Sequence, residues 1–192
     1  LGVFPDSGPV MVKGEVFIKM WIPATGEVLV DKHIDNVITL DASILAAILF
    51  KNSASRLGAT MLAIGTGATG ALLSPNAPNP AQRKLNAEIA RKAWSSTVWR
   101  DAGGSAVAIP TNVIDYNVTY DEGEAVGPLN EMGIMSTISQ NPLVQNLNPD
   151  AYPARDLTRD LTLYDILMNY ITMGVITKPS TARLSITWRI TH

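Results

Sequence analysis

Cysteine is absent from the sequence and histidine is scarce. Without cysteine the chain has no disulfide bond, no thiolate nucleophile and no cysteine-ligated metal site. The two histidines, His33 and His192, stand almost a whole chain apart and form neither an H-x-x-x-H nor an H-E-x-x-H pair. Zinc sites normally combine several histidines and cysteines. We therefore expect no metal site and no cofactor.

Charged side chains are also few. They make up 17% of the 192 residues, whereas about a quarter is typical of globular proteins. The formal net charge is −2 and no basic cluster occurs, which argues against binding to nucleic acid. Since 46% of the residues are hydrophobic, a surface so poor in charge is expected to be covered by other subunits. We predict a homo-oligomer.

Long apolar runs are missing as well. The longest, residues 44–50, has seven residues, whereas a membrane-spanning helix needs about 20. The opening stretch LGVFPDSGPV has no charged start before an apolar run, so we expect no signal peptide. We predict no membrane partner.

Alternating apolar and polar residues predict strands along most of the chain. Residues 15–22 alternate, and the turn PATGE and the segment VLV follow them, which indicates a hairpin with Gly26 in its turn. Trp21 lies on the other face of this strand from Val16 and Ile18, so it is either exposed or buried against a partner. Further strands are expected at 95–101, 112–120 and 131–138.

The closing strand has the clearest alternation of all. Its apolar face carries Leu184, Ile186, Trp188 and Ile190. Trp188 is therefore expected in the core. Residues 163–173 fit a helix or a strand.

Two other segments are predicted to be helical. The first covers residues 41–51, and either Thr39 or Asp41 can cap it. Its apolar residues at helical spacing are Ile44, Leu45, Ile48 and Leu49. The second, near 85–91, contains good helix formers. The fold class is therefore mainly β with one or two helices (α+β), with a β-sandwich or barrel-like core.

The chain is expected to form one domain. Residues 1–12 are interpreted as an extended arm, either a frayed end or a segment that lies on a neighbouring subunit. Residues 13–192 form a single β-rich domain with a long loop at 139–160, and long loops inside compact domains are often functional. Arg155 and Arg159 in this loop form either surface ion pairs along a helix or pairs between subunits. The candidate interface residues are Val3, Phe4, Trp21, Arg155 and Arg159.

Two short patterns suggest chemistry, and both have a simpler interpretation. AIGTGATG at 63–70 fits the G-x-G-x-x-G of dinucleotide-binding turns, but Pro75, Pro78 and Pro80 follow where a helix is needed. We interpret it as a strand-to-loop turn. DEGE at 121–124 is interpreted as a solvated turn in preference to half of a catalytic carboxylate pair or a calcium loop.

The catalytic patterns that we considered do not occur in the chain. No serine lies in a G-x-S-x-G motif. We therefore predict that the protein is not an enzyme. A nucleotide-binding enzyme is the remote alternative, and a carbohydrate-binding β-sandwich that uses exposed tryptophans is a third class.

Several short motifs occur in an order that resembles one family. They are LAIGTGATG, then KLNAEIAR after the proline-rich loop, then LNEMGIM, and the ending GVITKPSTARLSITWRI. Together they resemble the N-terminal module of tail-collar fibre proteins of tailed bacteriophages and short related phage structural proteins, over about residues 34–190. The proline insertion at 72–80 departs from the family's shorter loop. The matching positions are Gly65, Gly67, Leu85, Glu88, Arg91, Asn130, Glu131, Gly133, Lys178, Leu184, Ile186 and Trp188.

The resemblance implies a structural protein of the virion. It implies a tail-associated attachment or adaptor module, and the alternative is a capsid decoration (cement) protein on the head. The implied partners are other virion proteins of the tail, neck or head, including the major capsid protein, and further copies of the chain, with a trimer as one candidate.

The resemblance also suggests structural roles for particular residues. Glu88, Arg91 and Glu131 would form a buried ion-pair network, and breaking such a network from one side costs about 3–5 kcal/mol. Gly65, Gly67 and Gly133 would serve as turn glycines.

Overall fold

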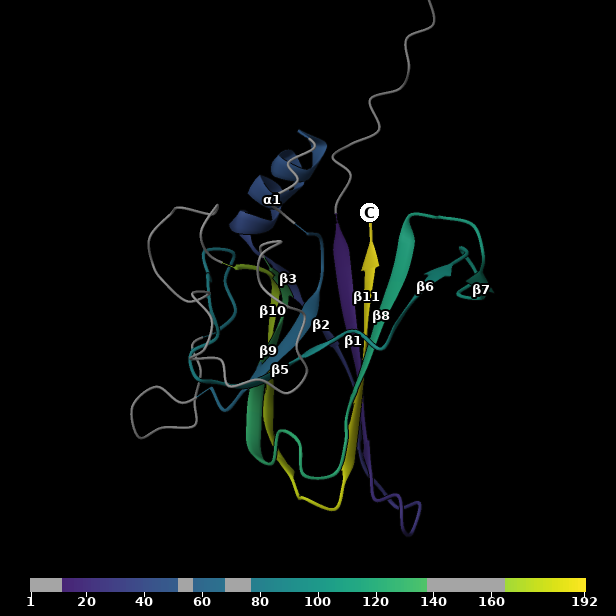
Figure 1. The fold of residues 1–192 in the computed structure, drawn as a ribbon, viewed down its shortest axis with the longest axis vertical. Coiled ribbons are helices and arrows are strands. Elements are labelled where there is room, and N and C mark those ends of the chain that lie inside the picture. The colour runs from purple at the N-terminus through teal and green to yellow at the C-terminus, as the bar shows by residue number, and fades with distance from the viewer. Residues whose placement is uncertain (1–11, 52–56, 68–76, 138–164) are drawn as a thin grey trace, which may run out of the picture.

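The structure is a computed structural model in which residues 12–51, 57–67, 77–137 and 165–192 are described. Two antiparallel sheets pack face to face as a β-sandwich, and one helix lies at one end (Figure 1). The expected fold class, mainly β with a sandwich core, is confirmed, and the sheets do not close into a barrel.

Sheet A has the strand order β2-β1-β11-β8-β6-β7. Its strands are β1 Lys13–Trp21, β2 Val28–Asp35, β6 Ser96–Arg100, β7 Ala106–Val107, β8 Val113–Tyr120 and β11 Arg183–Thr191. Sheet B has the order β3-β10-β9-β4-β5. Its strands are β3 Val37–Ile38, β4 Met61–Gly65, β5 Glu88–Ala93, β9 Gly127–Ser136 and β10 Ile166–Lys178.

The main core lies between the two sheets and follows the alternation seen in the sequence. Val16 of β1 and Trp188 of β11 are opposite each other in the register, and both are fully buried. Sheet B contributes Leu62 and Ile64 of β4 to the same core. Because successive side chains of a strand point to opposite faces, the neighbouring residues of β4 face away from sheet A and form a second, smaller cluster with Leu85.

The chain crosses between the sheets near both edges of the sandwich. On one side Asn36 separates β2 of sheet A from β3 of sheet B, and its N–H donates to Gly14 O at 3.2 Å. A Cβ on Gly14 would lie only 1.8 Å from Asn36 Oδ1, so the Asn36 side chain packs directly against the glycine and would have to move if position 14 carried a side chain. On the other side residues 94–95 join β5 to β6. These short crossings hold the two sheets together along their edges.

The first predicted helix is confirmed as α1 Leu40–Phe50, with Thr39 as its N-cap. The Thr39 hydroxyl accepts a hydrogen bond from the N–H of Ala42 at 3.2 Å and donates to Leu167 O at 2.6 Å. One side chain therefore both starts the helix and ties it to β10. Within the described residues, no helix combines the length and apolar character needed to cross a membrane.

The second predicted helix is wrong, because the segment near 85–91 enters strand β5 at Glu88. Ala90 pairs with Ile64 and Arg91 pairs with Ala63 in β4. Helix propensity is a weak preference of a few tenths of a kcal/mol per residue, and the pairing with β4 outweighs it. The ambiguous segment at 163–173 contributes to β10, the longest strand described.

The other predicted strands match β6, β8 and β9, and the predicted hairpin matches β1 and β2 with Gly26 in its turn at φ 73°. Several expectations lie outside the described residues. They are the arm with Val3 and Phe4, and the 139–160 loop with Arg155 and Arg159.

The dual role of the Thr39 hydroxyl gives a first testable prediction. We expect Thr39→Ala to lower the free energy of unfolding by about 1–2 kcal/mol, because both the helix cap and a buried hydrogen bond are lost. Thr39→Ser keeps the hydroxyl and should recover most of that loss. Urea denaturation measures both variants, and equal losses in the two would contradict the role given to the hydroxyl.

Candidate functional site

A buried charged group lies on the side of sheet B that faces away from sheet A. Arg91 of β5 is fully buried, and its Nη2 donates to Glu88 Oε2 at 2.9 Å. Its Nη1 donates to Asp165 Oδ2 at 2.7 Å. Burial lowers the pKa of Arg91, but the two carboxylates outweigh burial and hold the pKa above its ordinary value. Arg91 thus joins β5 to the residue that precedes β10.

Glu131 of β9 is fully buried nearby and accepts hydrogen bonds from neutral donors. Its Oε2 accepts from the backbone N–H of Asn86 at 2.9 Å and from the Tyr170 hydroxyl at 2.8 Å. Its Oε1 accepts from the backbone N–H of Ala87 at 2.7 Å. Burial and the Glu131 carboxylate both raise the pKa of Tyr170, so that hydroxyl remains a donor.

The three residues of the expected network therefore have two kinds of partner. Glu88 and Arg91 form an ion pair, whereas Glu131 accepts hydrogen bonds from the backbone before β5, from the Asn86 side-chain amide and from Tyr170. Sequence reasoning missed Asp165 and Tyr170. Both are far from Glu88 in the sequence, and only the order of strands in sheet B brings them close.

The three expected turn glycines lie at two kinds of position. At Gly65 and Gly133 a side chain would collide with neighbouring atoms, and at Gly67 the backbone is left-handed. Gly65 is paired with Glu88 on one side and Glu131 on the other. A Cβ on Gly65 would lie 2.4 Å from Ala87 O and 2.7 Å from Glu131 Oε1. The first glycine of the G-x-G-x-x-G match therefore makes room for Glu131 to reach across β4.

The other two glycines differ from each other. Gly133 lies inside β9, where a Cβ would be 2.7 Å from Asn169 O, so it is a close-packing position in a strand. Gly67 has φ 64°, a left-handed conformation that favours glycine. The third glycine of the match, Gly70, is outside the described residues.

The DEGE turn lies between β8 and β9, as expected, and its carboxylates meet cations from both sheets. Lys92 of β5 contacts Glu124, and Arg183 of β11 donates to Glu122 at 2.8 Å. Lys178 of β10 is fully buried and donates to Asp121 O at 2.8 Å. Burial lowers the pKa of Lys178, and the nearby carboxylates oppose that effect. The turn therefore serves as an ionic link between the sheets.

A third charged group lies on the outer face of sheet A. Asp115 of β8 is almost fully buried between two arginines, with Arg100 Nε at 2.8 Å and Arg189 Nε at 2.7 Å. Burial raises the pKa of Asp115, but the hydrogen bonds and charges of Arg189 and Arg100 outweigh it and bring the pKa below its ordinary value.

Glu15, His33 and Asp35 form an exposed cluster on the same face. Their oxygen and nitrogen atoms lie within 4.8 Å of one another, although sequence spacing gave no sign of it because they come from two paired strands. Glu15 Oε1 is already in contact with Lys13 Nζ at 3.1 Å and His33 Nε2 at 3.3 Å. Exposed acidic groups commonly lie this close together without a bound ion. The contacts of Glu15 with Lys13 and His33 are enough to explain why these side chains lie together.

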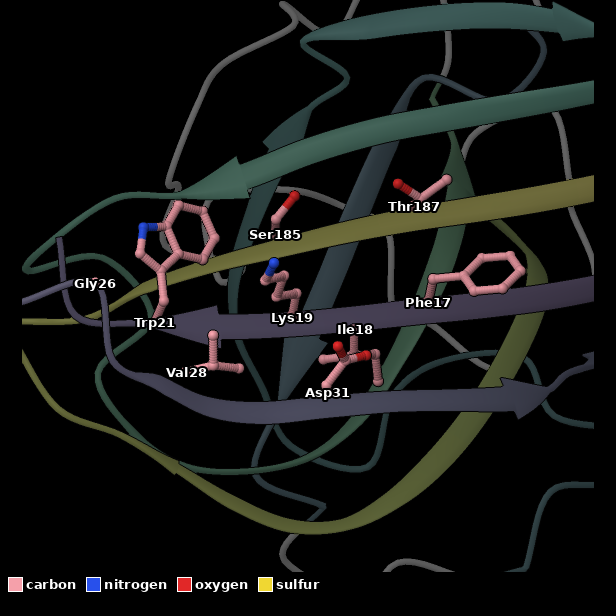
Figure 2. Close-up of a pocket in the computed structure, with 9 residues that line it drawn as sticks. All are labelled: Phe17, Ile18, Lys19, Trp21, Gly26, Val28, Asp31, Ser185 and Thr187. Atoms are coloured by element: carbon pink, nitrogen blue, oxygen red, sulfur yellow. The ribbon is translucent and has the colours of Figure 1, made fainter. Parts of the chain in front are cut away.

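A groove of about 460 Å³ runs over β1, β2 and β11 on the outer face of sheet A. We call it the sheet A groove. Figure 2 shows Trp21 and Lys19 of β1 on the same side as Ser185 of β11. Trp21, the one described residue among the candidate interface residues, is half-buried here.

The helix α1 exposes apolar side chains, including Ile44 and Leu49, which the sequence placed together with Leu45 on one apolar face. Leu45 is buried, whereas Ile44 is 46% exposed and Phe50 is 90% exposed. The signal was present in the sequence, because the only polar residues of LDASILAAILF are Asp41 and Ser43 near its start, and they do not form a polar face along the helix. Beside the helix lies an apolar groove of about 370 Å³ lined by Leu45, Leu49 and Met168.

No protein-family model matches the chain, and no curated protein matches it significantly.

The Glu131 carboxylate can be tested with two variants. Glu131→Gln places an NH₂ group where only acceptors fit, so we expect a loss of about 2–3 kcal/mol in the free energy of unfolding. Tyr170→Phe removes one donor and leaves the carboxylate its backbone partners, so its cost should be smaller, about 0.5–1.5 kcal/mol. Chemical denaturation gives both values, and the reverse order would contradict this assignment.

The two arginines around Asp115 predict a pH dependence. Because the folded pKa is lowered, the stabilisation is complete above the ordinary pKa of 3.8 and is lost as pH falls through the folded value. Asp115→Asn should therefore lower the thermal midpoint at neutral pH and make it less sensitive to acid. The exposed pair of Glu122 and Arg183 gives the control, since Glu122→Gln should change neither.

Proposed function

We propose that the protein is a non-enzymatic structural component of a phage particle, which acts through contacts between subunits as a tail-associated attachment or adaptor module. The observation that carries the proposal is the exposed apolar helix α1. Its virion setting rests on the resemblance to tail-collar fibre modules. The localisation proposed is the virion, and the partners are other virion proteins and further copies of this chain.

An apolar helix exposed to water favours association. Leu40 is 61% exposed and Phe50 is 90% exposed, and exposed apolar surface beyond scattered single residues favours an interaction site. Phe50 is an exposed aromatic ring, and an apolar groove lies beside the same helix. The ring of one copy of the chain can therefore pack into the groove of another copy. The low content of charge along the sequence supports the same conclusion.

The charged interior supports a role without catalysis. Every buried charged side chain among the described residues has a hydrogen-bond partner, and those partners join strands or connect the two sheets. A general acid or base must instead lie within hydrogen-bond reach of a substrate. These groups are placed to hold the sandwich together.

The alternative within the same class is a decoration protein on the phage head. The apolar helix suits either location, and the resemblance favours the tail. Copy number separates the two, since hundreds of copies per particle indicate the head, and three, six or twelve indicate the tail. A nucleotide-dependent enzyme remains the distant alternative, and calorimetric binding of a nucleotide in the micromolar range would favour it.

The helix surface is tested by replacing two of its exposed apolar side chains. Ile44→Gln with Phe50→Ser should leave the thermal midpoint almost unchanged, because exposed positions change stability by about 0.5 kcal/mol or less. We expect the double variant to lose self-association in sedimentation experiments and to enter assembled particles in reduced amounts.

A control for this experiment lies on β10. Val175 is 51% exposed and lies outside α1, so Val175→Ser removes exposed apolar surface without touching the helix. It should associate and assemble as the parent chain does. Normal association and incorporation of the double variant would refute the role of α1.

A further inference from the structure

We propose that the sheet A groove binds a neutral oligosaccharide, with Trp21 as its stacking platform. This inference goes beyond the assembly role, because it concerns a different face of the molecule and a small-molecule ligand. The groove's volume of about 460 Å³ falls within the range of about 300–1,000 Å³ found for ligand sites. Its floor is the paired strands β1, β2 and β11, which form a rigid base.

Trp21 provides a large aromatic surface at one end of the groove. It is half-buried, and Figure 2 shows its ring on the same side of the sheet as Ser185. Within the described residues its ring makes no aromatic or cation contact. The electron-rich face of an indole attracts groups with partial positive charge, and the C–H groups on one face of a sugar ring are such groups.

Phe17 closes the other end in a fixed position. Its ring stacks on His33 with a centroid distance of 4.5 Å, and the Arg189 guanidinium lies 5.4 Å from its centroid. Phe17 and Trp21 lie on one face of β1, four residues apart, which corresponds to about 13 Å along a strand. The site is long enough for a short oligosaccharide, and its rigidity reduces the entropy lost on binding.

The polar groups between the two rings suit hydroxyls. Within the described part of the chain, the side chains of Ser185, Lys19 and Asp31 make no hydrogen bond or ion pair, so their donors and acceptors are available. The Thr187 hydroxyl donates to Asn117 Oδ1 at 2.8 Å and can still accept. A sugar hydroxyl both donates and accepts, so it can use both kinds of group.

The charge in the groove selects an uncharged ligand. Lys19 and Asp31 are opposite each other in the register of β1 and β2, so one positive and one negative charge line the same floor. Neither a polyanion nor a polycation gains net attraction from such a pair. A neutral saccharide can bind both side chains through hydrogen bonds, and bonds to charged groups are the stronger ones.

The experiment screens the full chain against an array of neutral and acidic oligosaccharides. Any bound glycan is then titrated by calorimetry, whose signal does not depend on the tryptophan that the variants replace. We expect binding to neutral glycans, with an affinity about tenfold lower or more for Trp21→Ala. Ser185→Ala should weaken binding by a smaller factor. Trp21→Phe keeps an aromatic ring and should retain part of the affinity. This variant still tests the site if Trp21→Ala fails to fold.

Two control variants separate this proposal from the assembly role. Thr119 is paired with Ser185 across β11 and β8 but does not line the groove, so Thr119→Ala should bind as the parent does. The double variant of Ile44 and Phe50 should also keep its glycan binding. The proposal is overturned if no neutral glycan binds, if only acidic glycans bind, or if Trp21→Phe and Ser185→Ala both bind with unchanged affinity.

Discussion

The buried carboxylate of Glu131 constrains much of sheet B. A carboxylate taken out of water must receive hydrogen bonds on both oxygens, and Glu131 receives them from the backbone of Asn86 and Ala87 and from the Tyr170 hydroxyl. These partners lie on both sides of β9, so the single side chain fixes the segment before β5 against β10. The same need explains glycine at position 65, where any side chain would enter the path of the carboxylate.

Charge is concentrated at three structural positions and is sparse on α1. Arg91, the DEGE turn and Asp115 each combine opposite charges from segments that are far apart in the sequence. The helix has no such compensation for its apolar residues, and the sheet A groove has a balanced pair of charges between two aromatic rings. Two surfaces with different chemistry thus result from one fold, and our proposals place assembly at the apolar helix and saccharide binding at the polar, aromatic groove.

Sequence patterns predicted most of the fold, and tertiary contacts explain the failures. Strands with one buried face, such as β8 and β11, show a period of two because burial of one face selects apolar residues at alternate positions. The segment around Ala90 has helix formers, yet pairing with β4 makes it a strand. For the candidate site, the resemblance singled out Glu88, Arg91 and Glu131, and the structure buries all three in polar contacts. Trp21 stays a predicted interface residue. The sequence gave no indication of Asp165, Tyr170 or the groove.

The sequence by itself determined that this is a mainly β protein without cysteine chemistry, with a helix that begins near Thr39 or Asp41 and a core that includes Trp188. These features depend on composition and on local periodicity, which are properties of neighbouring residues. Only the tertiary structure decided which residues meet across strands: Glu131 with the segment before β5, Arg91 with Asp165, and Trp21 with Ser185. Such pairs depend on strand order and register, and no local pattern encodes a contact between residues so far apart along the chain.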